Sequence, residues 1–319
     1  MLNVWTIIGI ALIYVGLLVA VAGFGDRNAN ARRSNWLRPL IYSLSLAVYC
    51  SSWSFFGSVG VAARSGFDFL PFFIGPFIVL VAGWPVLRII VDVSKRQNIT
   101  SIADFISTRY GRNRTLGGIV ALIAVIGGVP YIALQVKAVA FSLVAILPQL
   151  NQPALAQVPI AIPNYVVIAI SVAMAGFSIV FGTRHIDTSE HQHGLMQAIA
   201  VQSVFKLVAF ITVGGLIMFA LIGGVGPMLD IVSQRTDIES TFFDASDGDR
   251  WLTMTLLSAF AMLLLPQQFH VAVVENEDVN DIRRAAFLFP LYLFLMGLFV
   301  VPIAIAGLYA FQAGGTDPD

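Results

Sequence analysis

Residues 116–136, LGGIVALIAVIGGVPYIALQV, contain no charged side chain and are long enough to cross the hydrocarbon core of a bilayer as a helix. The rest of the 319-residue chain has the same character, with 58% hydrophobic residues, 11% charged residues and a mean hydropathy of +0.84. A soluble domain carries about 25% charged residues, so this chain has too little charge to cover a surface facing water. We therefore predict an all-α integral membrane protein and exclude a soluble domain.

Eight apolar segments are long enough to be transmembrane helices. Backbone groups in lipid must satisfy one another, which favours helices over irregular structure in such segments. The predicted segments are 4–22, 39–58, 69–91, 116–147, 164–181, 195–222, 251–271 and 285–311. Between the third and fourth, a polar start at Asn98 followed by Ile102, Phe105 and Ile106 at helical spacing predicts a short amphipathic helix.

The distribution of lysine and arginine predicts how these segments are oriented. The loops on one side carry thirteen of these residues, whereas the opposite loops carry only Arg64, Arg235 and Arg250. Loops rich in positive charge stay in the cytoplasm. We expect a multi-pass protein of the bacterial inner membrane, with its N-terminus and residue 319 both outside the cytoplasm.

Polar residues inside the apolar segments mark candidate binding sites, because they are costly in lipid. Segment 39–58 contains Ser51 and Ser54 among other serines and glycines. Such a sequence tolerates an unwound turn whose carbonyls bind a small cation, as in the discontinuous helices of transporters. It equally suits close packing of helices through small residues. Both interpretations stay open at this point.

Three further segments have polar residues at comparable depth. In 116–147, Pro130 predicts a kink, Tyr131 and Gln135 share a face, and Lys137 is offset from both; we favour an interior role for Lys137 over one at the membrane surface. In 195–222, Gln202, Ser203 and Lys206 share a face of the helix. In 251–271, Pro266 interrupts the helix. The substrate-binding candidates are Ser51, Ser54, Tyr131, Gln135, Lys137, Gln202, Lys206, Gln267, Gln268 and His270.

Other kinds of site receive little support from the sequence. The loop 183–193 offers His185, Asp187, Glu190, His191 and His193, but their spacing matches no known zinc pattern, so we predict no metal site. The chain contains no phosphate-binding loop of the Gly-x-x-x-x-Gly-Lys-Ser/Thr type and no catalytic cluster. We expect no nucleic acid among its partners.

Several motifs occur in an order that resembles a known family. They are RPLIYSLSLAVYCSSWSFFGSVGVAARSGFDFLP, QNITSIADFISTRYG, VPYIALQVKAV, FGTRHIDTSEHQHG and LPQQFHVAVVEN. Together they resemble the membrane module of sensor histidine kinases of the CbrA type, which is itself a member of the sodium/solute symporter family. The resemblance covers essentially the whole chain.

The resemblance implies a LeuT-like bundle with two broken helices, preceded by an extra N-terminal helix and cytoplasmic loop in residues 1–38. Segments 39–58 and 251–271 then become the first and sixth core helices. Residues 1–319 form a symporter-like domain that stops before the eighth core helix. The resemblance further implies that the carbonyls of Ala47 and Cys50 hold a sodium ion, the only cofactor we consider. Tyr49 stands where the family's proline transporter has an aspartate, which argues against ordinary sodium coupling.

Three functions can be weighed on this basis. The first is a module that binds a small organic solute, such as an amino acid, and feeds a C-terminal kinase region and its response regulator. The alternative is a fragment of a stand-alone symporter coupled to sodium or protons. An enzyme embedded in the membrane would need a catalytic cluster, which the sequence lacks, and no kinase or ATP-binding region lies within residues 1–319.

Overall fold

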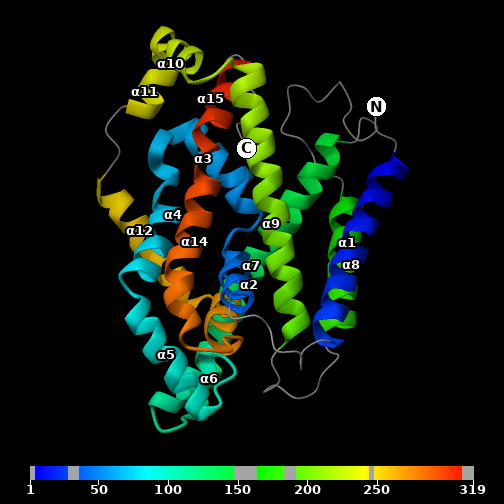
Figure 1. The fold of residues 1–319 in the computed structure, drawn as a ribbon, viewed down its shortest axis with the longest axis vertical. Helices are drawn as coiled ribbons and strands as arrows, with labels where there is room; N and C mark the ends of the chain where they lie inside the picture. Colours follow the sequence, from blue (N-terminus) through cyan, green and yellow to red (C-terminus); the bar gives the residue numbers. More distant parts are fainter. Residues whose placement is uncertain (1–3, 28–35, 147–163, 183–191, 244–247, 311–319) are drawn as a thin grey trace.

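The structure is a computed structural model that describes residues 4–27, 36–146, 164–182, 192–243 and 248–310. Every regular element within these ranges is helical, and several helices are long and apolar. The prediction of an all-helical membrane protein is thereby confirmed at this level, whereas the choice of membrane and the direction of the N-terminus stay predictions. The helices lie roughly along one axis of the molecule (Figure 1).

Four stretches of helix are long and apolar enough by themselves to cross a membrane. They are α1 (Val4–Arg27), α7 (Arg114–Ile146), α9 (His193–Gly215) with its π-helical extension η5 (Leu216–Leu221), and α14 (Asp281–Gly297) with α15 (Val300–Ala310). A fifth, shorter apolar helix is α8 (Asn164–Gly182). Each agrees with one of the apolar segments expected from the sequence.

Three further spans are broken. The first joins α2 (Leu37–Ser45) and η1 (Leu46–Tyr49) to η2 (Ser52–Ser54), α3 (Phe56–Ser65) and η3 (Gly66–Phe69), with a bend of 79°. The second joins α4 (Pro71–Val81) to α5 (Trp84–Gln97) at 67°. The third joins α12 (Gly248–Leu264) to α13 (Pro266–Phe269) and the π-helix η6 (His270–Val274) at 53°.

The breaks in the first and third of these spans were expected, whereas the break between α4 and α5 was not. Segment 69–91 was predicted to be continuous, but it breaks at Ala82 and Gly83. Pro85 follows as one of the first residues of α5. Proline has no N–H to donate to the carbonyl four residues earlier, and its ring clashes there, so a helix through Gly83 could not continue undisturbed.

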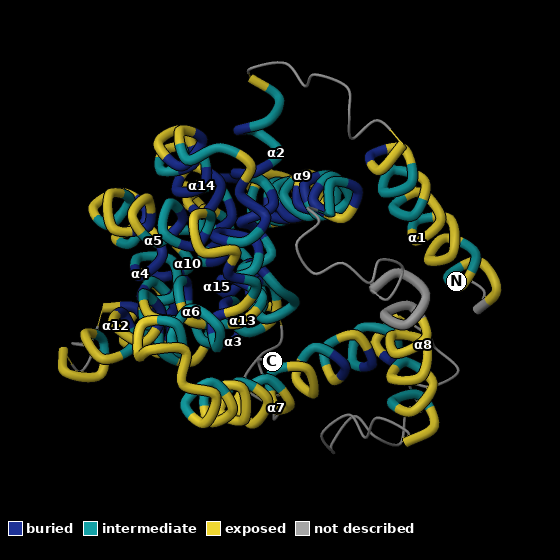
Figure 2. The backbone as a smooth tube through the Cα atoms, turned by 90° about the horizontal axis from the view of Figure 1, so that it is seen from below, coloured by how far each residue is buried: buried dark blue, intermediate teal, exposed yellow. Residues whose placement is uncertain are grey.

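The core lies where the broken spans meet α14. Helix α14 packs against α2 and α4, and α15 packs against α3. Phe289 and Met296 of α14 and Met262 of α12 are completely buried. Figure 2 shows buried backbone concentrated around α2, α14 and α15, with much of α1, α7 and α12 exposed. Exposed apolar side chains on the outer helices, such as Ile123 at 64%, suit contact with lipid.

The two ends of the bundle differ in structure. Helix α6 (Ile102–Arg109) confirms the expected amphipathic helix, and its N-cap residue Ser101 accepts a hydrogen bond from the Asp104 N–H (3.1 Å). Helices α5 and α6 and the start of α14 lie at one end of the molecule (Figure 1). Helices α10 (Val225–Gln234) and α11 (Thr236–Phe243) lie at the other. Helices α5 and α6 and the start of α14, which carry Arg88, Arg96, Arg109, Arg283 and Arg284, are therefore together at one end, and the side of the membrane that this end faces stays a prediction.

Candidate solute and ion site

The first broken span opens a short non-helical turn between η1 and η2. Cys50 has φ −78° and ψ 88°, and Ser51 is extended with φ −88° and ψ −171°. The Cys50 N–H still donates to the Ala47 carbonyl (3.0 Å), which closes the last turn of η1. Breaking the helix here leaves backbone carbonyls and N–H groups without the partners that a continuous helix would supply.

Lys206 of α9 reaches two of these carbonyls. Its Nζ donates to the Cys50 oxygen at 2.8 Å and to the Ala47 oxygen at 3.3 Å. These are the two oxygens that the family resemblance assigns to a sodium ion. In this structure they are bound by a cation that is part of the chain. An ammonium carries the same unit charge as sodium, and it donates directly to carbonyl oxygens.

Gln135 of α7 reaches the same turn from another direction. Its Oε1 accepts from the Ser52 N–H at 3.2 Å and also from the Ser52 hydroxyl, and its Nε2 donates to Ser51 Oγ at 3.2 Å. The structure thus brings the candidates Ser51, Gln135 and Lys206 to one turn. Ser52 was not among the predicted residues, although it is adjacent to Ser51 and carries the same kind of hydroxyl.

Tyr49, at the end of η1, connects the turn to two more helices. Its hydroxyl donates to the Phe72 carbonyl of α4 (3.0 Å) and lies 3.1 Å from Ser258 Oγ of α12. Ser258 Oγ also donates to the Phe72 carbonyl at 3.2 Å. Tyr49, which the sequence resemblance aligns with an aspartate of the proline transporter, therefore contributes a neutral hydroxyl that joins three helices. Ser258 was missed, because one serine in an apolar segment gives no distinctive signal.

The α9 side of the site is held by a buried tyrosine that was also missed. Tyr292 of α14 donates from its hydroxyl to the Ser203 carbonyl (3.1 Å). Ser203 is completely buried, and its hydroxyl donates to the Ile199 carbonyl at 2.8 Å. Because Ser203 is three residues before Lys206, this bond fixes the turn of α9 from which the lysine extends. Ser54, the remaining candidate of the first broken span, is buried and accepts from Ser58 Oγ through its carbonyl (2.6 Å).

The broken span α12–α13 contributes a different kind of site residue. Gln268 is completely buried, and neither its amide oxygen nor its nitrogen has a hydrogen-bond partner among the described residues. Gln267 is half-buried beside it. Helix α13 packs against η1, so this amide lies on a helix adjoining the first break. A buried amide without a partner is costly, and such groups mark places where a ligand or water is taken up.

His270 belongs to a separate group of polar residues. Its Nε2 lies 3.1 Å from the buried carboxylate of Glu275. The other oxygen of Glu275 accepts from the Gln192 N–H, at the start of α9 (2.9 Å). No hydrogen bond within the described part of the chain connects His270 to Gln135 or Lys206, so its candidacy for binding solute stays a prediction.

Lys137 is not where the sequence interpretation placed it. The structure puts it on the exposed face of α7, and an interior role is therefore wrong for this conformation. The reason is geometric: Lys137 is two residues after Gln135, which is about 200° around a helix. When Gln135 faces the broken span, Lys137 must face away. Tyr131 and Gln202 are half-buried and form no hydrogen bond within the described residues.

The histidine loop lies mostly outside the structure. Residues 183–191, with His185, Asp187, Glu190 and His191, are beyond the described ranges. Within those ranges no three His, Cys, Asp or Glu side chains gather as metal ligands would. His193 instead lies 3.0 Å from Glu277. The absence of a metal site stays a prediction.

Comparisons with protein families, with curated proteins and with solved structures find no match to this chain. The arguments on function therefore depend on the geometry above and on the motifs in the sequence.

Proposed function

We propose that this chain is a solute-binding transmembrane module of the sodium/solute symporter type, and that it is the sensor-transporter part of a membrane histidine kinase. The observation that carries the proposal is the polar turn at Cys50 and Ser51. Two other helices place a glutamine amide and a lysine ammonium on this turn. Polar groups of this kind inside a membrane protein mark substrate or ion pathways. Broken helices that meet at such a point are the usual framework of a transport site.

The arrangement suits a ligand with a carboxylate or another polar group, such as an amino acid. The Ser52 N–H, the Ser52 hydroxyl and the Ser51 hydroxyl are already held by a single movable amide, that of Gln135. A ligand oxygen that took the place of the Gln135 oxygen would receive the same two donors. The unpartnered Gln268 amide, on the adjoining helix α13, supplies further hydrogen-bonding capacity.

The second candidate is a stand-alone symporter, and the position of Lys206 decides which form of it we propose. Because the Lys206 ammonium donates to the Ala47 and Cys50 oxygens, those oxygens need no sodium ion. A symporter with this arrangement would be driven by another ion, a proton among them. A transporter and a sensor module share the solute site, so one binding experiment tests both.

The test is binding of solutes to the chain in nanodiscs, measured by scintillation proximity with labelled amino acids. We expect at least one amino acid to bind and Gln135→Ala to strengthen its binding about tenfold, because the ligand oxygen no longer has to displace the Gln135 oxygen from the two Ser52 donors. Gln234→Ala, at an exposed position of α10, is the matched control and should leave the affinity unchanged. Equal binding by wild type and Gln135→Ala would contradict the proposed site.

A second observation separates the two candidates. A dimerisation and ATP-binding region encoded in the same reading frame would favour the sensor module. A stop codon directly after the last core helix would instead favour the stand-alone symporter.

A further inference from the structure

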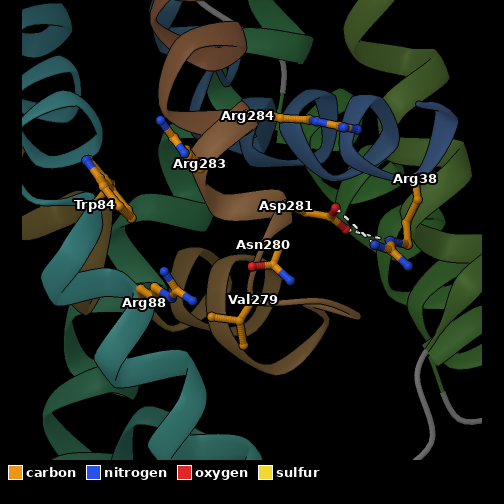
Figure 3. A pocket seen from close by; sticks show the side chains of 8 residues that line it. All are labelled: Arg38, Trp84, Arg88, Val279, Asn280, Asp281, Arg283 and Arg284. Atoms are coloured by element: carbon orange, nitrogen blue, oxygen red, sulfur yellow. Dashed lines mark hydrogen bonds and ion pairs between the residues drawn. The ribbon is translucent and has the colours of Figure 1, made fainter. Parts of the chain in front are cut away.

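A cavity of about 380 Å³ lies at the arginine-rich end of the bundle, and none of the residues that line it belongs to the solute site. It is formed by three separate segments: the start of α2, the first turns of α5, and the first turn of α14 with the two residues before it. Figure 3 shows their side chains around a common space. The charged residues that line it are Arg38, Arg88, Asp281, Arg283 and Arg284.

The carboxylate in this lining, that of Asp281, is already paired with Arg38. Arg38 Nε donates to Asp281 at 2.7 Å (Figure 3), and an Arg38 terminal nitrogen donates to Asp278 at the same distance. Asp281 is nearly buried, so its carboxylate is committed to this pair. Arg88 and Arg283, by contrast, form no hydrogen bond or ion pair within the described residues. The cavity therefore presents guanidinium groups that the nearby carboxylates leave unopposed.

Guanidinium groups that line one cavity favour an anion with several oxygen atoms. The planar fork of arginine matches the oxygens of phosphate and forms paired, charge-assisted hydrogen bonds with them. Arg88 comes from α5 and Arg283 from α14, and these two helices pack against each other. A phosphate between them would be contacted from both sides.

The surroundings of the cavity indicate that this phosphate carries hydrocarbon chains. Phe287, one turn beyond Arg283 on α14, is 71% exposed, and Ile89, next to Arg88, is 63% exposed. Trp84, whose ring lines the cavity, is a residue type enriched at the boundary between lipid and water. Basic pockets between transmembrane helices on the cytoplasmic side bind anionic head groups. We propose that this cavity binds the phosphate-bearing head group of an anionic phospholipid, with the acyl chains lying along the exposed apolar residues of α5 and α14.

Binding at this position would connect α14 to α5, the second half of a broken span. A lipid held there should therefore stabilise the folded chain, since any ligand that binds only the native state raises its stability. This inference does not depend on the proposed solute site. Residues of the solute site, such as Gln135 and Lys206, are absent from the cavity lining.

The experiment uses the full 319-residue chain in a neutral detergent, titrated with phosphatidylglycerol or phosphatidylcholine. Native mass spectrometry measures the bound lipid, and the melting temperature measures stabilisation. We expect phosphatidylglycerol to bind more tightly than phosphatidylcholine and to raise the melting temperature. The double variant Arg88→Gln with Arg283→Gln should weaken binding of phosphatidylglycerol about tenfold or more, because two charge-assisted contacts are lost. Both arginines are exposed and have no ion-pair partner among the described residues, so without lipid the variant should melt like the wild type.

The matched control is the double variant Arg96→Gln with Arg114→Gln. It removes the same charge from exposed positions at the same end of the bundle but outside the cavity. We expect less than a twofold change in its lipid affinity. An equal loss in both double variants would overturn the proposal, because general surface charge would then explain the binding. Inorganic phosphate and glycerol 3-phosphate are titrated in parallel. If either bound as tightly as phosphatidylglycerol, the site would be one for a free phosphate and the lipid assignment would be wrong.

Discussion

Replacing Lys206 by methionine tests the bond between α9 and the first broken span. Methionine keeps most of the side-chain volume and removes the ammonium. The Cys50 carbonyl loses its Lys206 donor at 2.8 Å. The Ala47 carbonyl loses the longer bond from Lys206, at 3.3 Å, but still accepts from the Cys50 N–H at 3.0 Å. The loss therefore falls mainly on a single charge-assisted bond, worth about 1.5–3 kcal/mol. Part of this is offset, because methionine does not have to be desolvated. We expect a net destabilisation of about 2 kcal/mol.

The measurement is reversible unfolding of the chain in mixed micelles by increasing denaturing detergent, followed by circular dichroism. Lys137→Met is the matched control: it removes the same ammonium from an exposed position on α7 and should change the free energy of unfolding by less than about 0.5 kcal/mol. If Lys206→Met unfolds together with wild type and control, the two carbonyl bonds contribute nothing, and the reasoning from this geometry is refuted.

The response to sodium tests whether Lys206 occupies an ion site. Lys206→Ala leaves the Ala47 and Cys50 oxygens without the ammonium. If these oxygens are part of an ion site, sodium at ten times its dissociation constant should stabilise this variant by about 1.4 kcal/mol and leave the wild type unaffected. The stabilisation by sodium is measured relative to the same concentration of potassium. If the wild type were stabilised as much as Lys206→Ala, Lys206 would not exclude the ion.

Four further predictions follow from other parts of the structure. A reporter fused after Ser94 should be cytoplasmic and one at Asp247 external; an external signal at Ser94 would contradict the predicted orientation. Proteoliposomes bearing residues 1–319 should show no sodium-dependent uptake of amino acids above empty vesicles, and robust uptake driven by a sodium gradient would contradict the role given to Lys206. Gln268→Leu should raise the free energy of unfolding by about 1–2 kcal/mol, because it removes an unpartnered buried amide, and should weaken solute binding; a destabilised variant would mean that the amide is satisfied in the membrane. The pKa of Asp278 is lowered, first by the backbone N–H of Asn280 and then by the neighbouring guanidinium, so its contribution to stability is present above about pH 4 and is lost as the pH falls further. Unfolding of Asp278→Asn followed against pH should lack that part of the acid destabilisation.

The sequence by itself determined the elements that follow from local composition. Long uncharged segments must form helices in lipid, because no water is present to satisfy their backbone groups. The break at Pro266 was visible from the proline itself, the break near Ser51 was one of two interpretations of its serines and glycines, and the polar start at Asn98 predicted the amphipathic helix α6. The break at Gly83 was also local, but its Gly-Trp-Pro signal lies inside a hydrophobic run that looked continuous.

Only the tertiary structure decided which side chains meet. Lys206 was recognised as an interior residue, but its contact with the Ala47 and Cys50 carbonyls depends on how α9 is rotated against a chain segment about 160 residues earlier. Lys137 was misplaced because the same polar residue can face either way until packing fixes the rotation of α7. The cavity between α2, α5 and α14 has no signal in any one of its three segments. Local sequence sets whether a segment is a helix, since lipid enforces internal hydrogen bonding, whereas the rotation and crossing of helices depend on side-chain packing between segments far apart in the chain.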